Sequence, residues 1–202
     1  MFYEIGQSHG LRHDPFKSLV VPRPIGWISS RDRHGVVNLA PYSFFNAVSS
    51  EPPIVAFASN GPHGEGGPKD TVRNVQDTGE FVCNLATWDT REAMNATSAM
   101  VPRAVDEFAL AGLTAVPSKL VAPPRVQESP AQLECRYLKT VELPSADPRE
   151  PNRVVFGQVV GVHIDDRVLR DGLVDVQALR PIARLGYSDY TVVDQVFRMR
   201  RP

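Results

Sequence analysis

The sequence predicts a mainly β protein, an antiparallel barrel of six strands with two or three short helices added. Short apolar runs recur along the chain and are separated by turn residues. Proline is frequent, at 18 of 202 residues, which favours short elements with stiff connections. The alternative is a doubly wound nucleotide-binding fold. It needs a glycine-rich turn after its first strand, and WISSRDRHG lacks the G-x-G-x-x-G pattern.

The whole chain, residues 1–202, is predicted to form one domain. Its length suits one substantial core, and neither repeats nor a Gly/Ser-rich linker divides it. The net charge of −1 gives no basic excess for nucleic acid. There is no leader pattern at the start and no apolar run long enough for a membrane span. We therefore expect a cytoplasmic protein with neither a nucleic-acid nor a membrane partner.

The first three strands are predicted between residues 24 and 59. Ile25, Trp27 and Ser29 alternate with their neighbours, and RDRHG supplies a turn in which Gly35 can adopt a positive φ. VVNLA then returns as the second strand. PPIVAFAS forms the third, entered through proline, which a strand tolerates at its first residue.

Three further strands are predicted from EFVCNLAT, QLECRYLKTVEL and RVVFGQVVGVHID. The last two are joined by the loop PSADPREPN. The two cysteines, Cys83 and Cys135, lie in these apolar runs without a CxxC or metal spacing. We expect both to be buried free thiols.

Two helices are predicted. KDTVRNVQDTG places Val72 and Val75 on one face, with Asp70 or Thr71 as the N-cap and Gly79 as the stop. DTREAMNATSAM contains good helix formers after an Asp-Thr start. The segment 169–190 has a mixed pattern that assigns no clear element.

APYSFFNAVSSEPP, residues 40–53, is predicted to be a loop between two strands, because it is rich in hydroxyls and ends in two prolines. Asn46 and Ser49 offer polar groups, and Val48 and Trp27 offer apolar contact. A flat ring with a polar edge, such as a flavin, needs this mixture. The alternative is an ordinary turn that satisfies its own Asn and Ser side chains.

NGPHGEGGPKDT, residues 60–71, is a glycine-rich loop that delivers Lys69, Asp70 and Thr71 to the start of a helix. The free N–H groups of a helix start, a lysine charge and a threonine hydroxyl together make a phosphate site. The alternative is a capped surface helix with a solvated lysine. The loop is not a Walker A motif, because the G-x-x-x-x-G-K-[ST] spacing is absent.

Other catalytic signals are absent from the sequence. The five histidines are scattered, so we expect no metal site, although His63 lies near the proposed phosphate loop. No G-x-S-x-G elbow and no carboxylate pair of recognisable spacing occurs. We therefore assign no catalytic residue. Arg184, Tyr187 and Tyr190 either line a pocket or serve packing and surface roles.

Several segments taken in order resemble the flavin reductase-like family, over residues 16–193. They are RPIGWISSRDRHGVVNLAPYSFFNAVSSEPPIVAFA, KDTVRNVQDTGEFVCNL, DEFALAGLT, RVQESPAQLECRY and RLGYSDYTVV. The most similar subgroup includes flavoredoxin-like proteins and the reductase components of two-component monooxygenases. The resemblance implies a six-stranded split β-barrel of Greek-key type. It also implies a homodimer with one FMN per subunit near the interface.

The resemblance implies hydride transfer from NADH or NADPH to flavin, with reduced flavin passing to a partner monooxygenase. One alternative is an FMN-containing electron-transfer protein without steady NAD(P)H turnover. Another is a pyridoxamine-phosphate type oxidase, which needs a second basic phosphate pocket.

The resemblance also implies the residues that bind FMN. The phosphate lies against Lys69, Asp70 and Thr71, with Ser59 in reach, and the ring lies along two segments. Those segments comprise Trp27, Ile28, Ser29 and Ser30, and Asn46, Ala47, Val48 and Ser49. The insertion GPHGEGG before Lys69 is longer than the usual connection of the family.

Overall fold

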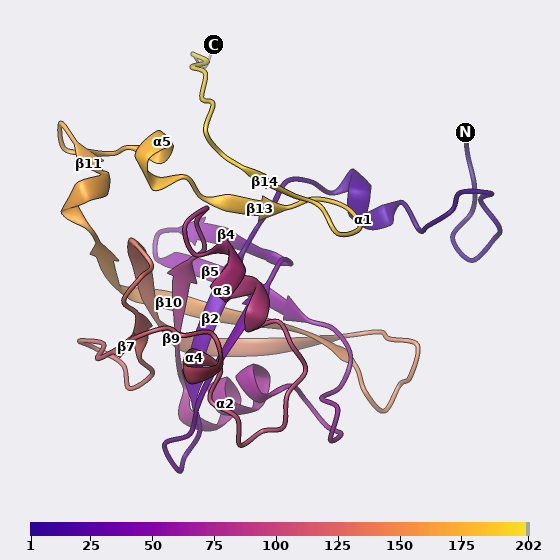
Figure 1. Ribbon diagram of the computed structural model, residues 1–202. Helices are drawn as coiled ribbons and strands as arrows, with labels where there is room; N and C mark the ends of the chain where they lie inside the picture. The colour runs from indigo at the N-terminus through magenta and orange to yellow at the C-terminus, as the bar shows by residue number, and fades with distance from the viewer. Residues whose placement is uncertain (201–202) are drawn as a thin grey trace.

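A computed structural model describes residues 1–200 (Figure 1). Its centre is an antiparallel sheet with the strand order β3-β2-β6-β9-β10-β5-β4. The strands are β2 (Gly26–Arg31), β3 (Val37–Tyr42), β4 (Phe45–Ser50), β5 (Pro53–Ser59), β6 (Glu80–Leu85), β9 (Ala131–Leu143) and β10 (Asn152–Ile164). The predicted mainly β, antiparallel fold class is confirmed, and all six predicted strands are present.

The prediction of a loop at residues 40–53 is wrong. Phe45–Ser50 forms β4, which pairs with β5 through partners such as Asn46 and Ala56. β4 is the last strand of the sheet, so its outer edge meets no neighbour within the described chain. An edge strand that is exposed to solvent tolerates polar side chains, which explains why the strand has the composition of a loop.

The smaller elements surround this sheet. A second sheet contains β1 (Arg23–Pro24), β13 (Ile182–Arg184) and β14 (Tyr190–Val192). Two short pairs are β7 (Ala115–Val116) with β8 (Arg125–Val126) and β11 (Leu169–Arg170) with β12 (Leu173–Val174). The helices are α1 (Phe16–Leu19), α2 (Asp70–Thr78), α3 (Arg91–Ala96), α4 (Glu107–Leu110) and α5 (Val176–Leu179), with a 3-10 turn at Asp166–Val168. The segment 169–190, which the sequence left unassigned, thus contains β11, β12, α5 and β13 and ends at the first residue of β14.

Two apolar clusters form the core on the two faces of β2. Trp27 packs with Met94 and Phe108 in one cluster, and Ile28 packs with Phe57 and Phe81 in the other. Successive side chains of a strand point to opposite faces, so β2 is buried on both sides. The Trp27 indole Nε1 donates to Thr97 Oγ1 at 2.9 Å, which satisfies its buried N–H group.

The two predicted helices are present, with one correction at a cap. α2 packs Val72 and Val75 into the core and ends at Gly79, whose φ of 77° is left-handed, as predicted. The predicted N-cap at Asp70 or Thr71 is wrong, because the N-cap is Lys69 and no side chain caps it. The side chains of Asp70 and Thr71 bind other partners instead, as described below.

The free thiols Cys83 and Cys135 are buried in β6 and β9, as predicted. Burial, with the neighbouring Cys135, raises the pKa of Cys83 well above its usual range. Cys83 is therefore protonated at neutral pH, and both cysteines pack in the apolar core.

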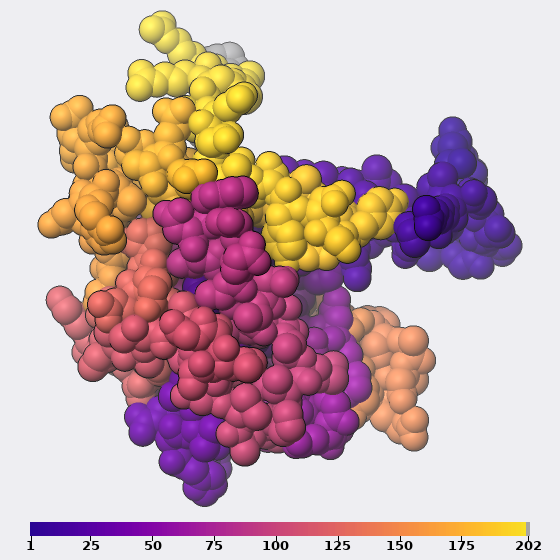
Figure 2. All heavy atoms as spheres, in the orientation of Figure 1, coloured from indigo at the N-terminus to yellow at the C-terminus, as the bar shows by residue number. Residues whose placement is uncertain are grey.

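The two ends of the chain leave the body of the protein (Figure 2). Residues before α1 extend to one side, and residues after β14 extend away from the second sheet (Figure 1). Both ends expose apolar side chains, including Phe2, Ile5 and Phe197. Within residues 1–200, no helix has the length and apolar character that crossing a membrane requires.

Gly157 gives a direct test of this packing. A Cβ atom built on Gly157 would clash with Phe81 Cζ, and Phe81 is fully buried. We expect Gly157→Ala to lower the free energy of unfolding by about 1–3 kcal/mol, because the core has no room for the methyl group. Urea denaturation measures this change.

Gly161→Ala, on the same strand, is the matched control. Its Cβ approaches the half-exposed Leu120 side chain at 3.2 Å, so this neighbour can move aside. Equal destabilisation by the two substitutions would show that contact with Phe81 is not the cause.

Candidate functional site

A cavity of about 120 Å³ lies where β3, the glycine-rich loop before α2 and the turn after α3 meet. We call it the phosphate cavity, after the phosphate site that the sequence predicts at Lys69, Asp70 and Thr71. It is lined by Asn38, Ala40, Pro41, Tyr42, His63, Lys69, Asp70, Thr71, Thr97, Ser98, Ala99, Met100, Val101 and Glu107. Three of the predicted site residues, Lys69, Asp70 and Thr71, are therefore brought together in one cavity.

The start of α2 gives this cavity donors for an anion. In the first backbone hydrogen bond of the helix, Arg73 N donates to the Lys69 carbonyl. The N–H groups of Asp70, Thr71 and Val72 therefore have no acceptor within the helix. Burial lowers the pKa of Lys69, so its ammonium is a partly desolvated cation beside these donors. Helix N–H groups and a cation are the chemistry that holds a phosphate.

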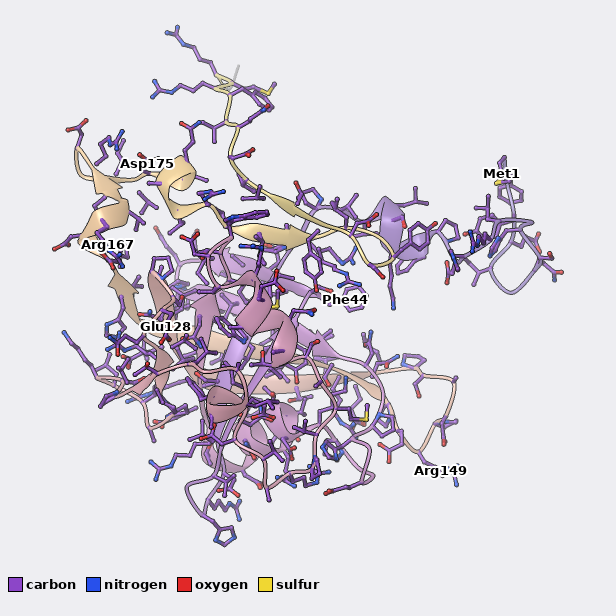
Figure 3. All side chains as sticks on the ribbon, in the orientation of Figure 1. Met1, Phe44, Glu128, Arg149, Arg167 and Asp175 are labelled. Carbon is purple, nitrogen blue, oxygen red and sulfur yellow. The ribbon has the colours of Figure 1, made fainter. Side chains whose placement is uncertain are left out.

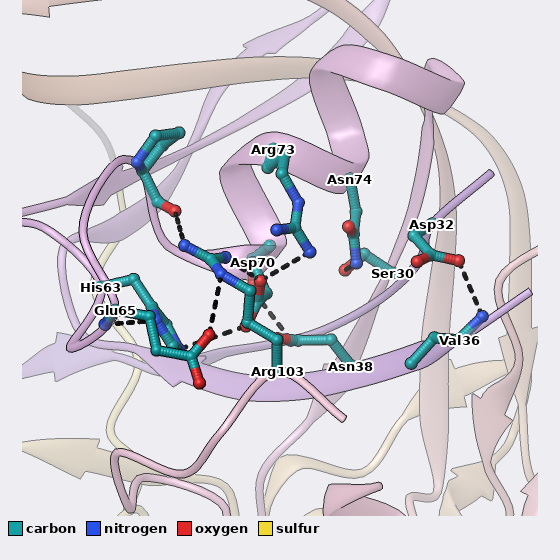
Figure 4. A network of polar contacts seen from close by, with 12 residues as sticks. Ser30, Asp32, Val36, Asn38, His63, Glu65, Asp70, Arg73, Asn74 and Arg103 are labelled. Carbon is teal, nitrogen blue, oxygen red and sulfur yellow. Dashed lines mark hydrogen bonds and ion pairs between the residues drawn. The ribbon is translucent and has the colours of Figure 1, made fainter. Parts of the chain in front are cut away.

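Asp70 does not present a free negative charge to the cavity (Figure 4). Its Oδ1 accepts a hydrogen bond from Arg103 Nη1 and forms an ion pair with Arg73 Nη2 at 2.8 Å. His63 Nε2 lies 3.4 Å from the second carboxylate oxygen. Arg103 also donates to the Gly66 carbonyl at 2.7 Å, so one arginine ties the glycine-rich loop to the helix start. Asp70 is thus the anchor of the loop.

Thr71 and Tyr42 connect the cavity to the sheet behind it. Thr71 Oγ1 accepts from Asn38 Nδ2 at 3.0 Å, which orients the amide of β3 toward α2. Burial raises the pKa of Tyr42 to about 12. Hydrogen bonds with Thr71 and Ser59 act in the opposite direction and lower this pKa, but burial has the larger effect. Ser59 is itself 4% exposed and does not line the cavity, so it lies behind Tyr42.

Glu107 adds a second carboxyl group to the wall. It is 7% exposed, and its Oε2 accepts from Leu39 N at 3.1 Å. Burial, with the charges of Asp70 and Asp106, raises its pKa to about 6. At neutral pH this group adds negative charge to the cavity, and at mildly acid pH it is neutral.

Two further hollows continue from the phosphate cavity. One of about 290 Å³ shares Pro41 and Ser98 with it. A third of about 540 Å³ shares Arg23, Ser43 and Phe44 with the second and reaches Asn46. Figure 3 shows Phe44 below the sheet formed by β13 and β14. Together the three hollows follow the corner between β3 and β4.

The other predicted ring-binding residues lie elsewhere. The side chains of Trp27, Ile28, Ser29 and Ser30 are fully buried and line none of the three hollows. Ser29 donates to the Pro124 carbonyl, and Ser30 accepts from Asn74 Nδ2 at 3.2 Å. Ala47, Val48 and Ser49 lie on the edge strand β4, outside the hollows.

Sequence reasoning missed the contribution of β3 and of the turn after α3 to this cavity. Asn38, Ala40 and Tyr42 face the phosphate cavity from β3, and Met100 and Val101 face it from the turn. The signal for Asn38 was a polar residue inside an apolar strand, NLA. Met100 and Val101 carried no signal, because only the tertiary structure brings that turn beside α2. Arg184, Tyr187 and Tyr190 do line a pocket, the second hollow.

The family model of the flavin reductase like domain matches residues 18–182. The chain belongs to the flavin reductase-like family. An uncharacterized protein of Halalkalibacterium halodurans is 37% identical over 183 residues, covering 91% of this chain and 87% of the relative. An uncharacterized protein of Aquifex aeolicus is 40% identical over 173 residues, covering 85% of each chain.

Solved structures of the family show the same fold. Nitrilotriacetate monooxygenase component B from Bacillus cereus superimposes with a TM-score of 0.86 at 29% identity, over 98% of this chain and 99% of that one. A Shewanella frigidimarina structure described as having a split barrel domain gives 0.79 at 26% identity, over 93% and 90%. The resemblance read from the sequence is thus confirmed, as is the split-barrel fold class.

The raised pKa of Glu107 predicts a pH-dependent stability. The carboxyl has a pKa of about 6 in the folded chain against 4.5 for the free group. The unfolded chain therefore releases this proton first as the pH rises. As the pH rises from below 4.5 to above 6, the contribution of Glu107 to the free energy of unfolding falls by about 2 kcal/mol in total.

Glu107→Gln keeps an oxygen that accepts from Leu39 N and removes the charge. We expect the unfolding free energy of this variant, relative to the unchanged chain, to rise by about 2 kcal/mol between pH 4 and pH 8. Urea denaturation at both pH values measures the difference. If the difference in unfolding free energy between the variant and the unchanged chain is the same at both pH values, the raised pKa of Glu107 is contradicted.

Proposed function

We propose that the chain is an FMN-binding flavin reductase that takes hydride from NADH or NADPH and supplies reduced flavin to a monooxygenase. The observation that supports this proposal is the phosphate cavity, in which Lys69 and Thr71 meet the open start of α2. In a member of the flavin reductase-like family, the phosphate of FMN is the anion that fits these donors.

The size of the hollows agrees with a flavin mononucleotide. A cavity of about 120 Å³ holds a phosphate but not a flavin ring. Pockets for such ligands measure roughly 300–1,000 Å³. The adjoining hollow of about 290 Å³ supplies the remaining room past Pro41. We propose that Lys69, Thr71 and the N–H groups of α2 hold the phosphate and that the ring lies toward Phe44.

The residues of the chain bind and orient the cofactor. Flavin, when bound, supplies the hydride and electron chemistry. The partly desolvated ammonium of Lys69 neutralises charge on the phosphate. The Asp70–Arg103 pair holds the glycine-rich loop at the phosphate end of the site. Met100 and Val101 offer apolar cover at the cavity mouth. Because the flavin supplies the chemistry, the protein needs no acid or base of its own, and we assign no catalytic residue.

The remaining predicted residues take indirect parts in this proposal. We propose that Trp27, Ile28, Ser29 and Ser30 support β3 from the core, and that Ser59 supports Tyr42, without touching the flavin. Asn46 reaches the ring side from the third hollow. Ala47, Val48 and Ser49 lie on the unpaired edge of β4, and Val48 is 52% exposed. We propose that this edge meets a second copy in a homodimer.

Loss of the cationic and hydroxyl donors tests the phosphate assignment. We expect Lys69→Ala and Thr71→Ala each to weaken FMN binding by about 1.5–3 kcal/mol, roughly tenfold to 150-fold. Quenching of flavin fluorescence measures the dissociation constants. Lys139→Ala, on β9 beside Phe156, is the control and leaves them unchanged. Unchanged binding in both cavity variants would contradict the assignment.

The activity itself is tested with purified protein. We expect oxidation of NADH or NADPH with FMN, FAD or riboflavin, followed as loss of nicotinamide absorbance. No turnover with any pair above a buffer control would contradict the reductase. A yellow protein that ignores NAD(P)H and is reduced only by another protein would indicate an electron carrier instead.

A further inference from the structure

A buried acid, Glu107, forms part of the wall of the phosphate cavity. It is the first residue of α4, and it lines the cavity together with Lys69 and Thr71. An ionised carboxylate in this place would repel a phosphate, and burial would leave its charge poorly hydrated. A neutral Glu107 therefore suits an anion in the cavity better than a charged one.

Glu107 lacks the cation that usually accompanies a buried carboxylate. Among the ion pairs in the described part of the chain, none involves Glu107. The nearby Asp70, by contrast, pairs with both Arg73 and Arg103. Glu107 Oε2 accepts instead from an uncharged donor, Leu39 N, at 3.1 Å. These surroundings favour the protonated form of Glu107.

The other charged and titratable groups around Glu107 come from several elements. Asp106 precedes it in the chain, and Tyr42 faces the cavity from β3. The rest line the phosphate cavity or a hollow of about 10 Å³ that Glu107 also lines, and they are Asp32, His63, Lys69, Asp70, Arg73 and Arg103. Burial, with the charges of Asp70 and Asp106, raises the pKa of Glu107 to about 6. Near neutral pH its carboxyl is therefore ionised in the free chain, and a neighbouring anion favours its protonation.

We propose that Glu107, in its protonated form, donates a hydrogen bond to the phosphate of FMN, an assignment that rests on the proposed function. A protonated carboxyl has one O–H donor, and its other oxygen can still accept from Leu39 N. A buried carboxylic acid that stays neutral near neutral pH can serve as such a donor. The proton comes from solvent, so FMN that binds to a chain with an ionised Glu107 takes up one proton at this carboxyl.

Proton uptake makes the affinity for FMN depend on pH through Glu107. The pKa of Glu107 is about 6 in the free chain, and the negative phosphate raises it further when FMN is bound. Below pH 6 the carboxyl is already neutral before FMN arrives. Above pH 6 binding has to protonate it, so the affinity falls as the pH rises. FMN is therefore retained in mildly acid solution and exchanges more readily in alkaline solution.

Glu107→Gln tests this linkage, because the amide keeps an oxygen for Leu39 N and an N–H donor for the phosphate but has no charge. At about pH 5 we expect the variant and the unchanged chain to bind FMN with dissociation constants that agree within about threefold. At about pH 8 we expect the unchanged chain to bind about tenfold more weakly than the variant. Quenching of flavin fluorescence measures these constants. The phosphate itself ionises near pH 6, and this effect cancels because both chains bind the same ligand.

Calorimetric titration with FMN at about pH 7, in two buffers of different ionisation enthalpy, counts the protons directly. We expect the unchanged chain to take up about 0.4 proton more per FMN than Glu107→Gln. A purely structural role of Glu107 would not produce this difference. Asp106→Asn is the matched control, because it removes the carboxylate of the preceding, exposed residue, which does not line the cavity, and keeps an N-cap for α4. We expect its proton uptake to equal that of the unchanged chain.

Equal proton uptake by the unchanged chain and Glu107→Gln would overturn the proposal. A ratio of their FMN dissociation constants that is the same at both pH values would also overturn it. Either result, with FMN still bound, would leave the proposed function intact. Loss of the proton uptake in Asp106→Asn as well would assign the effect to the general charge of α4 and not to Glu107. A chain that binds FMN at neither pH would contradict the proposed function and, with it, the role of Glu107.

Discussion

The candidate site depends on the Asp70 carboxylate at the start of α2. Arg73 and Arg103 neutralise it, and Arg103 also binds the Gly66 carbonyl. These contacts hold the glycine-rich loop against the helix and keep the carboxylate paired. Without them a negative charge would lie beside the donors that suit an anion. The same contacts leave the N–H groups of the first turn and the Lys69 ammonium available.

Charge is compensated differently in the phosphate cavity and in the second hollow. At the phosphate cavity the acids Asp70 and Glu107 lie among donors, and each has a local partner or a raised pKa. In the second hollow, Arg23 and Arg184 are accompanied by carbonyls and rings and by no carboxylate of the described chain. Arg23 is buried there and Arg184 is half-buried, so water hydrates their charges only in part.

The edge strand β4 shows the limit of composition as a guide to structure. Its Asn and Ser residues are typical of a turn, yet they pair with β5. Edge position relaxes the requirement for apolar alternation, and no local pattern reports which strand will lie at an edge. The same limit affected the candidate site. Trp27–Ser30 has the alternation of a strand with one open face, but helices and loops bury it on both.

The sequence by itself determined six strands, two helices and the turns at Gly35 and Gly79, and it predicted Lys69 and Thr71 as the phosphate donors that we propose. These follow from periodicity, backbone conformation and neighbours within a few residues, all of which are local. Only the tertiary structure decided that Asn38 meets Thr71, that Arg103 meets Asp70 and that Arg23 lies beside Arg184. These residues are far apart in the chain. Their approach depends on strand order and core packing, which no local pattern encodes.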